Sequence, residues 1–285
     1  MSAAEYPPGA LGKPIRGPSA LGGSPHRFFH LVRTLAVLDF KLRFFGSALG
    51  YFWQVMRPLM LFAVLYVVFT EFVQLGDGVN FYPVLLLMGI VLFTFFADVT
   101  GDCVTSVVDR ESLVRKIQFP RLVIPLAVLL RAYFNLALNL LVVLGFALAL
   151  GVDPHLSWFQ VPFLLLALGV FAAGVGMIVS AAFVRYRDIK PIWEVVLQML
   201  FYGTPILYVV ELVPREGLKE LLMISPLGAI VEQMRHAFVD PTAPSAAEAA
   251  GGYVMLLIPA GIVAFLFLFG FWYFNRAAPR IAEEL

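Results

Sequence analysis

The chain has 285 residues, of which 61% are hydrophobic and only 14% are charged, whereas ordinary soluble domains have about 25% charged residues. This composition excludes a soluble globular protein, and the single cysteine, Cys103, excludes an intramolecular disulfide or a Cys-rich metal site. The formal net charge of +1 gives no indication of a nucleic-acid partner.

Six apolar stretches approach or exceed the roughly 20 residues that a helix needs to cross the hydrocarbon core of a bilayer. In chain order they are Tyr51–Val73, Phe81–Ala97, Leu122–Leu150, Val161–Val184, Ile192–Val213 and Tyr253–Phe274. The sequence therefore predicts an all-α integral membrane protein with six transmembrane helices, which form one domain over residues 49–275.

The distribution of positive charge predicts the orientation of these spans. With six spans both termini lie on one side, and sixteen of the 20 Lys and Arg residues fall on that side. They are Lys13, Arg16, Arg27, Arg33, Lys41, Arg43, Arg57, Arg110, Arg115, Lys116, Arg121, Arg185, Arg187, Lys190, Arg276 and Arg280. The positive-inside rule then places both termini in the cytoplasm.

The segments before the first span are polar and then amphipathic. Residues 1–25 are rich in Gly, Pro, Ser and Ala, which predicts a disordered cytoplasmic tail, and residues 276–285 form a second cytoplasmic tail. Over residues 26–48, apolar side chains recur at helical spacing, at Phe28, Leu31, Leu35, Leu38, Leu42 and Phe45. We expect an amphipathic helix in the cytoplasmic interface; the alternative is a plain cytoplasmic helix that packs on the bundle.

The stretch from Asp98 to Pro125 is too polar for lipid but keeps an amphipathic pattern, which predicts a cytoplasmic helix. Glu111 and Arg115 are four residues apart, with the acid first, a favourable helical pairing. Phe119-Pro120 should end the helix, because the residue before a proline resists helical geometry. The segment is interpreted either as a docking surface for a cytoplasmic partner or as a solvated loop helix.

Within the third span, Arg131, Asn135 and Asn139 repeat every four residues and share one helix face. Because an Arg near the middle of a membrane is costly, this face should point inward. One interpretation is contact with an anionic or sugar-containing substrate, and the other is an interhelical hydrogen-bond stripe.

Two later connections also carry information. The turn Arg185-Tyr186-Arg187-Asp188-Ile189-Lys190-Pro191 presents charge to the cytoplasm, either for docking or as a positive-inside anchor. Between the fifth and sixth spans, residues 214–224 and 226–238 predict two short apolar helices separated by Ser225-Pro226. They either re-enter the membrane from the outer face or lie on the outer surface.

Taken in order, several short motifs resemble the permease subunit of type 2 ABC exporters, in particular the O-antigen and teichoic acid exporters, over about residues 27–275. The motifs are Leu49-Gly50, Trp53, Pro58-Leu59, Phe119-Pro120-Arg121 with Pro125, Arg185-Tyr186-Arg187-Asp188-Ile189, Tyr202, Thr204-Pro205-Ile206 and Ser225-Pro226-Leu227. The family usually has Asn at the position of Ser225, although Ser caps helices comparably.

The resemblance implies a homodimeric permease in a bacterial cytoplasmic membrane, among membrane lipids, that works with two copies of a separate ABC ATPase. Its substrate would be a polysaccharide on a polyprenyl diphosphate lipid. The sequence agrees, because it has no G-x-x-x-x-G-K-[ST] loop for nucleotide phosphates, so ATP would be bound by the partner. The resemblance places ATPase docking at Asp109, Glu111, Arg115, Lys116, Arg185, Arg187 and Asp188.

For the substrate path, aromatic walls can hold sugar rings by stacking. The candidates with Arg131, Asn135 and Asn139 are Tyr66, Phe96 and Tyr202, and no catalytic, cofactor or metal residue is predicted. Two alternatives remain: an exporter of a drug or lipid, and a membrane-embedded enzyme acting on lipid-linked sugars, for which Asp98, Asp102 and Asp109 are the only candidate carboxylates.

Overall fold

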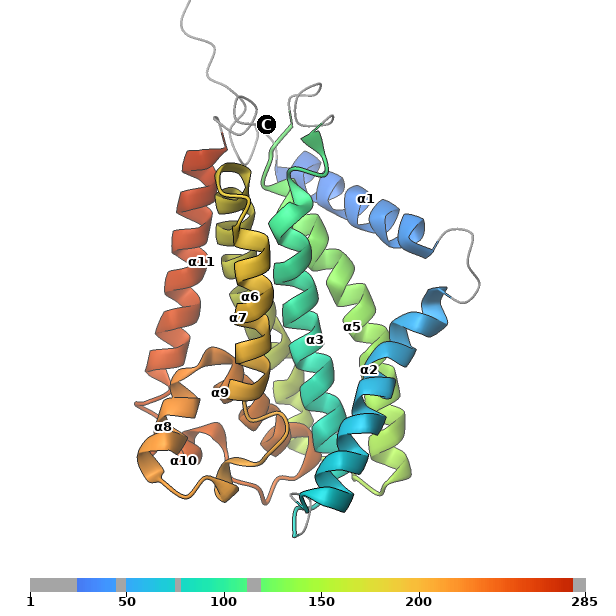
Figure 1. Ribbon diagram of the computed structural model, residues 1–285, viewed down its shortest axis with the longest axis vertical. Coiled ribbons are helices and arrows are strands. Elements are labelled where there is room, and N and C mark those ends of the chain that lie inside the picture. Colours follow the sequence, from blue (N-terminus) through green and yellow to red (C-terminus); the bar gives the residue numbers. More distant parts are fainter. Residues whose placement is uncertain (1–24, 45–49, 75–77, 112–118, 279–285) are drawn as a thin grey trace, which may run out of the picture.

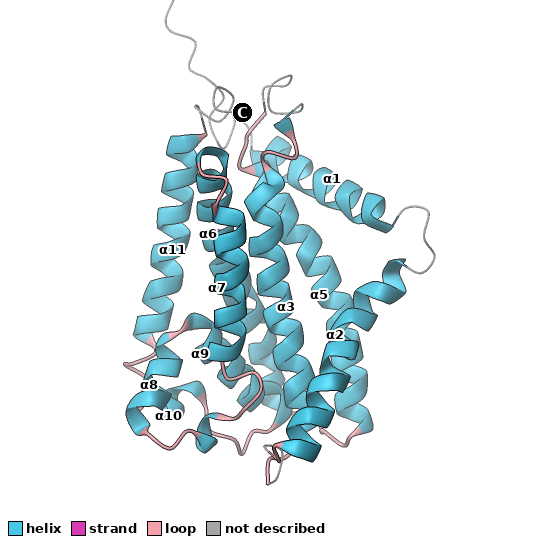
Figure 2. Ribbon diagram, in the orientation of Figure 1, coloured by secondary structure: helices cyan, strands magenta, loops and turns pink. Residues whose placement is uncertain are grey.

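The computed structural model describes residues 25–44, 50–74, 78–111 and 119–278, and all regular secondary structure in these ranges is helical (Figure 2). The longer helices are α1 (Pro25–Phe44), α2 (Gly50–Val67), α3 (Tyr82–Ser106), α5 (Val123–Ala149), α6 (Val161–Arg185), α7 (Ile189–Gly203) and α11 (Leu257–Ala277). The shorter ones are α8 (Glu216–Ile224), α9 (Pro226–Met234), α10 (Ala246–Ala249), the π-helices η1 (Val68–Phe72) and η4 (Arg235–Val239), and the 3₁₀ helices η2 (Leu156–Gln160) and η3 (Val210–Leu212).

Five helical segments in the described residues are long and apolar enough to cross a membrane. They are Phe52–Phe72, Tyr82–Ser106, Val123–Ala149, Leu156–Arg185 and Leu257–Ala277. The first, second, third, fourth and sixth predicted spans are therefore confirmed as helices of this kind.

The predicted fifth span, Ile192–Val213, is wrong as a single helix. Helix α7 has 15 residues and ends at Gly203, and Thr204 is extended (φ −95°, ψ 143°). The cause is Pro205, because the residue before a proline avoids helical geometry. A 15-residue helix is about 22 Å long, which is less than the roughly 30 Å of hydrocarbon.

The non-helical segment after α7 is buried against α3. Ile206, Leu207 and Val209 are all buried, and the Tyr82 hydroxyl donates a hydrogen bond of 2.8 Å to the Leu207 carbonyl oxygen. Irregular backbone inside a membrane is tolerated where protein covers it. Here the protein covers the segment, and Tyr82 provides a partner for one of its carbonyl oxygens.

The second span is longer than predicted. Helix α3 continues to Ser106 instead of ending at Ala97, so Asp98 and Asp102 belong to it and not to a separate cytoplasmic helix. The polar residues are tolerated because they are partnered: the Thr100 hydroxyl donates to the Phe96 carbonyl oxygen at 2.8 Å, and Asp102 forms an ion pair with a cation of α5. The rest of the predicted helix includes residues 112–118, which lie outside the described residues.

The core is built around α3, which is buried over most of its length and contacts α2, α5, α6 and α7. Helices α6 and α11 pack closely at Gly174 and Gly270. A Cβ atom on Gly174 would lie 2.7 Å from the backbone nitrogen of Phe267, and one on Gly270 would lie 2.3 Å from the carbonyl oxygen of Gly174. These two glycines therefore permit the close helix crossing, as small residues do between membrane helices.

Helix α1 lies across one end of the bundle, where α11 also ends and where α6 turns into α7 (Figure 1). We call this the α1 end. The predicted helix over residues 26–48 is confirmed from Pro25 to Phe44, but its buried face is Phe28, Val32 and Ala36, whereas Leu38 and Leu42 are exposed. The predicted apolar face is therefore only partly correct. Helix α1 packs on α5, and its second half does so through Phe40, which lies outside the predicted face and contacts the ring of Phe134.

The short helices α8, α9 and α10 gather at the opposite end of the bundle (Figure 1), which we call the α8–α10 end. The prediction of two short helices separated by Ser225-Pro226 is confirmed, although the Ser225 side chain makes no capping hydrogen bond. Helix α9 is buried along nearly its whole length, whereas only Met223 of α8 is buried.

Candidate functional site

The polar stripe of α5 is held by an ion pair that the sequence analysis missed. A guanidinium nitrogen of Arg131 donates to a carboxylate oxygen of Asp102 on α3, and the Arg131 side chain is 13% exposed. Asp102 was assigned to a cytoplasmic helix outside the spans, so it was not considered as the partner, although a charged residue within a span requires one. This geometry favours the interpretation of Arg131 as a link between helices.

Asn135 and Asn139 continue the stripe and are both buried. The Asn139 side-chain nitrogen donates to the Asn135 backbone oxygen at 3.0 Å. Among the described residues, the side-chain oxygen of Asn135 has no hydrogen-bond partner, which leaves one acceptor on this stripe for another donor.

The three aromatic candidates lie on different helices and do not form one wall within the chain. Tyr66 of α2 is half-buried and stacks on Phe62, with ring centroids 5.6 Å apart. Phe96 of α3 is fully buried and stacks on Phe171 of α6 at 5.0 Å. Only Tyr202, on α7, is 60% exposed, so Phe96 cannot touch a substrate in this conformation.

The predicted docking residues that are described lie at the α1 end (Figure 1). Asp109 follows α3 and accepts a hydrogen bond of 2.7 Å from the Thr105 hydroxyl, and Glu111 is half-buried at the end of the same segment. Arg115 and Lys116 lie outside the described residues. A neighbouring ion pair between Arg110 and Asp39 joins this segment to α1.

The turn between α6 and α7 presents charge at the same end. Arg185, Arg187 and Asp188 are exposed, and Asp188 makes no capping bond to α7. The Arg187 guanidinium lies 5.1 Å from the ring centroid of Phe183, and that of Arg185 lies 5.5 Å from the ring of Tyr186. Both cations remain open to a partner.

At the α8–α10 end, a buried charge cluster joins three segments. Arg235 of η4 donates to Glu211 of η3 at 2.7 Å and to Glu232 of α9 at 3.1 Å. Arg235 and Glu232 are both buried, whereas Glu211 is partly exposed. In the sequence, Arg235 follows Glu232 by three residues within an apolar segment, a spacing that allows an ion pair on a helix. This pairing was not among the predictions. The cluster ties the chain after α7 to α9.

The two carboxylates of this cluster differ in exposure. The Glu232 side chain is 2% exposed, whereas the Glu211 side chain is 43% exposed. Glu232 is therefore the partner that Arg235 holds in the interior of the protein.

Asp102 and Asp109, two of the three carboxylates considered for an enzyme, have separate partners, Arg131 and Thr105. In the part of the chain that the structure describes, no group of three or more His, Cys, Asp or Glu side chains is arranged to hold a metal ion.

The sequence profile of the ABC-2 type transporter family matches residues 30–239, from α1 to the end of η4. The chain belongs to the ABC-2 type transporter family. The match covers the α5 stripe, the α6–α7 turn and the buried charge cluster, so all these features lie within the family domain.

Relatives of this ABC-2 type transporter align along most of their length. An O-antigen export system permease protein RfbA of Klebsiella pneumoniae is 29% identical over 258 residues, which cover 90% of this chain and 95% of the relative. RfbA of Myxococcus xanthus, also named as an O-antigen export system permease protein, is 25% identical over 78% of this chain and 85% of the relative. The polysialic acid transport protein KpsM of Escherichia coli is 22% identical over 72% of this chain and 80% of the relative.

Proposed function

We propose that the chain is the permease subunit of an ATP-driven exporter that moves a polysaccharide, linked to a polyprenyl diphosphate lipid, from the cytoplasm outward. The observation that carries this proposal is the family match over residues 30–239 together with relatives of nearly equal length that are named as O-antigen export permeases. A relative named for polysialic acid transport supports the same substrate class. Neither a drug or lipid exporter nor a membrane enzyme receives comparable support.

The energy for transport comes from a separate ATPase, present in two copies, that docks at the α1 end. The sequence has no phosphate-binding loop. The exposed charges of Arg185, Arg187 and Asp188, together with Asp109 and Glu111 after α3, supply a polar surface for that partner.

The α1 end faces the cytoplasm, because the predicted excess of positive charge lies there. In this topology α7 and the segment after it complete a sixth crossing, and α9 enters the membrane from the outer face. The burial of α9 among α6 and α11 supports re-entry, whereas the exposure of α8 is consistent with a position on the outer surface. Helix α1 lies in the cytoplasmic interface, with Leu38 and Leu42 free to contact lipid.

Two copies of the chain form the transport path, and α7 contributes to the face between them. None of the α7 side chains is buried within the chain, and its exposed residues include Glu194 and Gln198 beside Met199 and Tyr202. Polar side chains within a membrane point toward protein or a water-filled cavity in preference to lipid. By contrast, the exposed side chains of α11 at Phe265, Leu268 and Trp272 are apolar or aromatic. The α7 face combines these polar side chains with the exposed apolar side chains of Ile192 and Val195, and it therefore suits a second copy and the passing sugar chain.

Cysteine cross-linking tests this dimer. Met199→Cys, on the exposed face of α7, should give a covalent dimer in native membranes with a short bifunctional thiol reagent. Leu268→Cys, equally exposed on α11, is the matched control and should stay monomeric. Native Cys103 is buried and should not interfere. Dimers through Leu268→Cys alone would contradict the assigned face, and a strictly monomeric protein would contradict the exporter.

The docking surface is tested by charge reversal. The double variant Arg185→Glu with Arg187→Glu should reduce copurification of the ATPase about ten-fold or more, because like charges across an interface cost several kcal/mol. The matched control is Arg215→Glu with Lys219→Glu at the α8–α10 end, which should copurify normally. Membrane insertion should be unchanged in both. Normal copurification of the first variant would show that the α6–α7 turn is not the docking site.

A further inference from the structure

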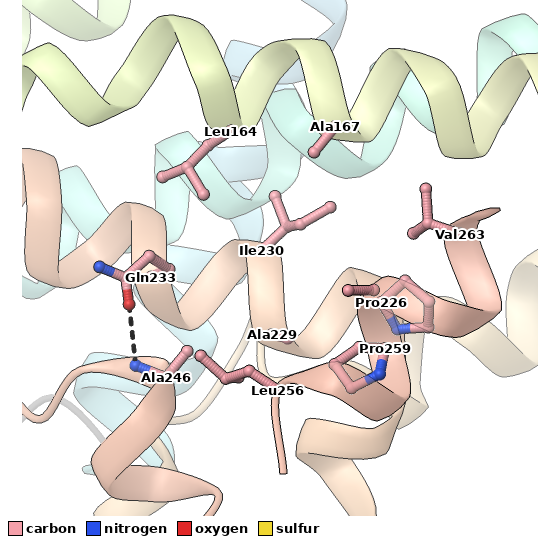
Figure 3. A pocket seen from close by; sticks show the side chains of 11 residues that line it. Leu164, Ala167, Pro226, Ala229, Ile230, Gln233, Ala246, Leu256, Pro259 and Val263 are labelled. Atoms are coloured by element: carbon pink, nitrogen blue, oxygen red, sulfur yellow. Dashed lines mark hydrogen bonds between the residues drawn. The ribbon is translucent and has the colours of Figure 1, made fainter. Parts of the chain in front are cut away.

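A cavity of about 310 Å³, open on one side, lies between α6, α9, α10 and α11 (Figure 3). Its position follows from the close crossing of α6 and α11 at Gly174 and Gly270. Ala167 and Val263 line the cavity, each seven residues from that crossing toward the α8–α10 end. Helix α9 contacts both helices at this end, and the small side chains of Ala229 and Ala260 leave the remaining space unfilled.

The lining is apolar except for Gln233, whose polar atoms are already bonded. Its nitrogen donates to the side-chain oxygen of Gln160 at 2.8 Å, and its oxygen accepts from the Ala246 backbone nitrogen at 3.1 Å (Figure 3). A buried water needs two to four polar partners, and a sugar needs partners for its hydroxyls. The cavity offers neither, so it fits a hydrocarbon group.

The source of such a group is the bilayer. Two of its walls, α6 and α11, are helices that are long and apolar enough to span the bilayer. Beside the cavity, α6 exposes Phe163 and Leu166, and α11 exposes Leu257. The cavity is therefore flanked by surfaces that face lipid. A cavity of about 150 Å³ holds one benzene molecule, so this cavity holds roughly twelve carbon atoms, about the chain length that crosses half of a hydrocarbon core.

We propose that this cavity is a binding site for one acyl chain of a bilayer phospholipid. The acyl chain lies between α9 and the pair of helices α6 and α11. An acyl chain fits better than the isoprenoid chain of the substrate, because none of the lining residues comes from α2 or α7, and the polar face proposed for the path lies on α7. The bound chain stabilises the position of α9 between the two spanning helices. Because the acyl chain comes from an apolar solvent, van der Waals packing against the cavity walls, and not removal from water, supplies the affinity.

The test is photolabelling of the full-length chain in vesicles of phosphatidylethanolamine that carries a diazirine on one acyl chain. Peptide mapping of the wild-type protein should find labels on cavity residues such as Ile230 and Val263. Ala260→Phe should abolish most of these labels, because the added ring occupies the space that the chain would fill. The matched control is Ala264→Phe, on the same helix but outside the lining, and it should label like the wild type.

A second variant and a second probe keep the outcomes distinct. Ala167→Leu fills the cavity from the opposite wall and should also reduce the labels, so the test does not depend on the folding of one variant. Unchanged cavity labelling in both filled variants would overturn the proposal, as would labelling confined to the outer surface of α11. Cavity labelling by a diazirine isoprenoid but not by the phospholipid would show that the substrate lipid is the occupant instead. All three results can be obtained with an inactive exporter, so they do not depend on the proposed function.

Discussion

Replacing Arg235 with Met should destabilise the folded protein by about 3 to 5 kcal/mol, the usual cost of removing one partner from a buried ion pair. In this chain the substitution leaves Glu232 buried without its cation and removes the 2.7 Å link to Glu211. The segment after α7 would then lose its ion-pair link to α9. The measurement is the thermal unfolding midpoint of the purified protein in detergent, together with the yield of folded protein.

The control for this prediction removes both buried charges. Arg235→Met combined with Glu232→Leu should recover most of the lost stability, because a buried ion pair can often be replaced by apolar residues at little cost. Glu211→Gln should cost much less, since Glu211 is partly exposed. If Arg235→Met and the double variant unfold at the same temperature as the wild type, the buried cluster does not hold this end of the molecule.

Replacing Arg131 with Gln should lower the free energy of unfolding by about 1 to 3 kcal/mol, because Asp102 loses its cation within a span. The Asp102 side chain is partly exposed, which reduces the cost. The substrate response of the surviving protein should be kept, since Gln can still bond across the helices. The measurement is the melting temperature and the substrate-stimulated ATPase of the same preparation of the complex.

The double variant Arg131→Gln with Asp102→Asn separates the two interpretations of Arg131. If Arg131 links α3 and α5, removing both charges should restore part of the melting temperature. A normal melting temperature with a lost substrate response would instead assign Arg131 to the anionic headgroup. Normal values for both would place Arg131 at the interface, where its long side chain can reach water.

The sequence was sufficient for features that depend on local pattern. Long apolar runs predicted five of the spans, and Ser225-Pro226 predicted the break between α8 and α9. The errors arose where a tertiary contact changes the local preference. Asp102 looked too polar for a span, but its pairing with Arg131 allows α3 to continue to Ser106.

Other features depend on packing that a linear pattern does not contain. Thr204-Pro205 carried the signal that ends α7, but the buried position of the following segment depends on Tyr82, far away in sequence. Phe96 looked like a candidate for the path, and its stacking on Phe171 places it in the core instead. The cluster around Arg235 joins residues 24 positions apart, so its sequence signal was incomplete. Whether an aromatic side chain can line the path or belongs to the core depends on its burial and its contacts more than on its residue type.

The most direct test of the exporter uses the chain in proteoliposomes with and without its partner ATPase, supplied with lipid-linked polysaccharide on the ATPase side. We expect no ATP hydrolysis by the purified chain alone, hydrolysis when the ATPase is present, and ATP-dependent appearance of the polysaccharide on the opposite side. ATP hydrolysis by the chain alone, or an assembled complex that hydrolyses ATP but moves no lipid-linked polysaccharide, would contradict the proposed function.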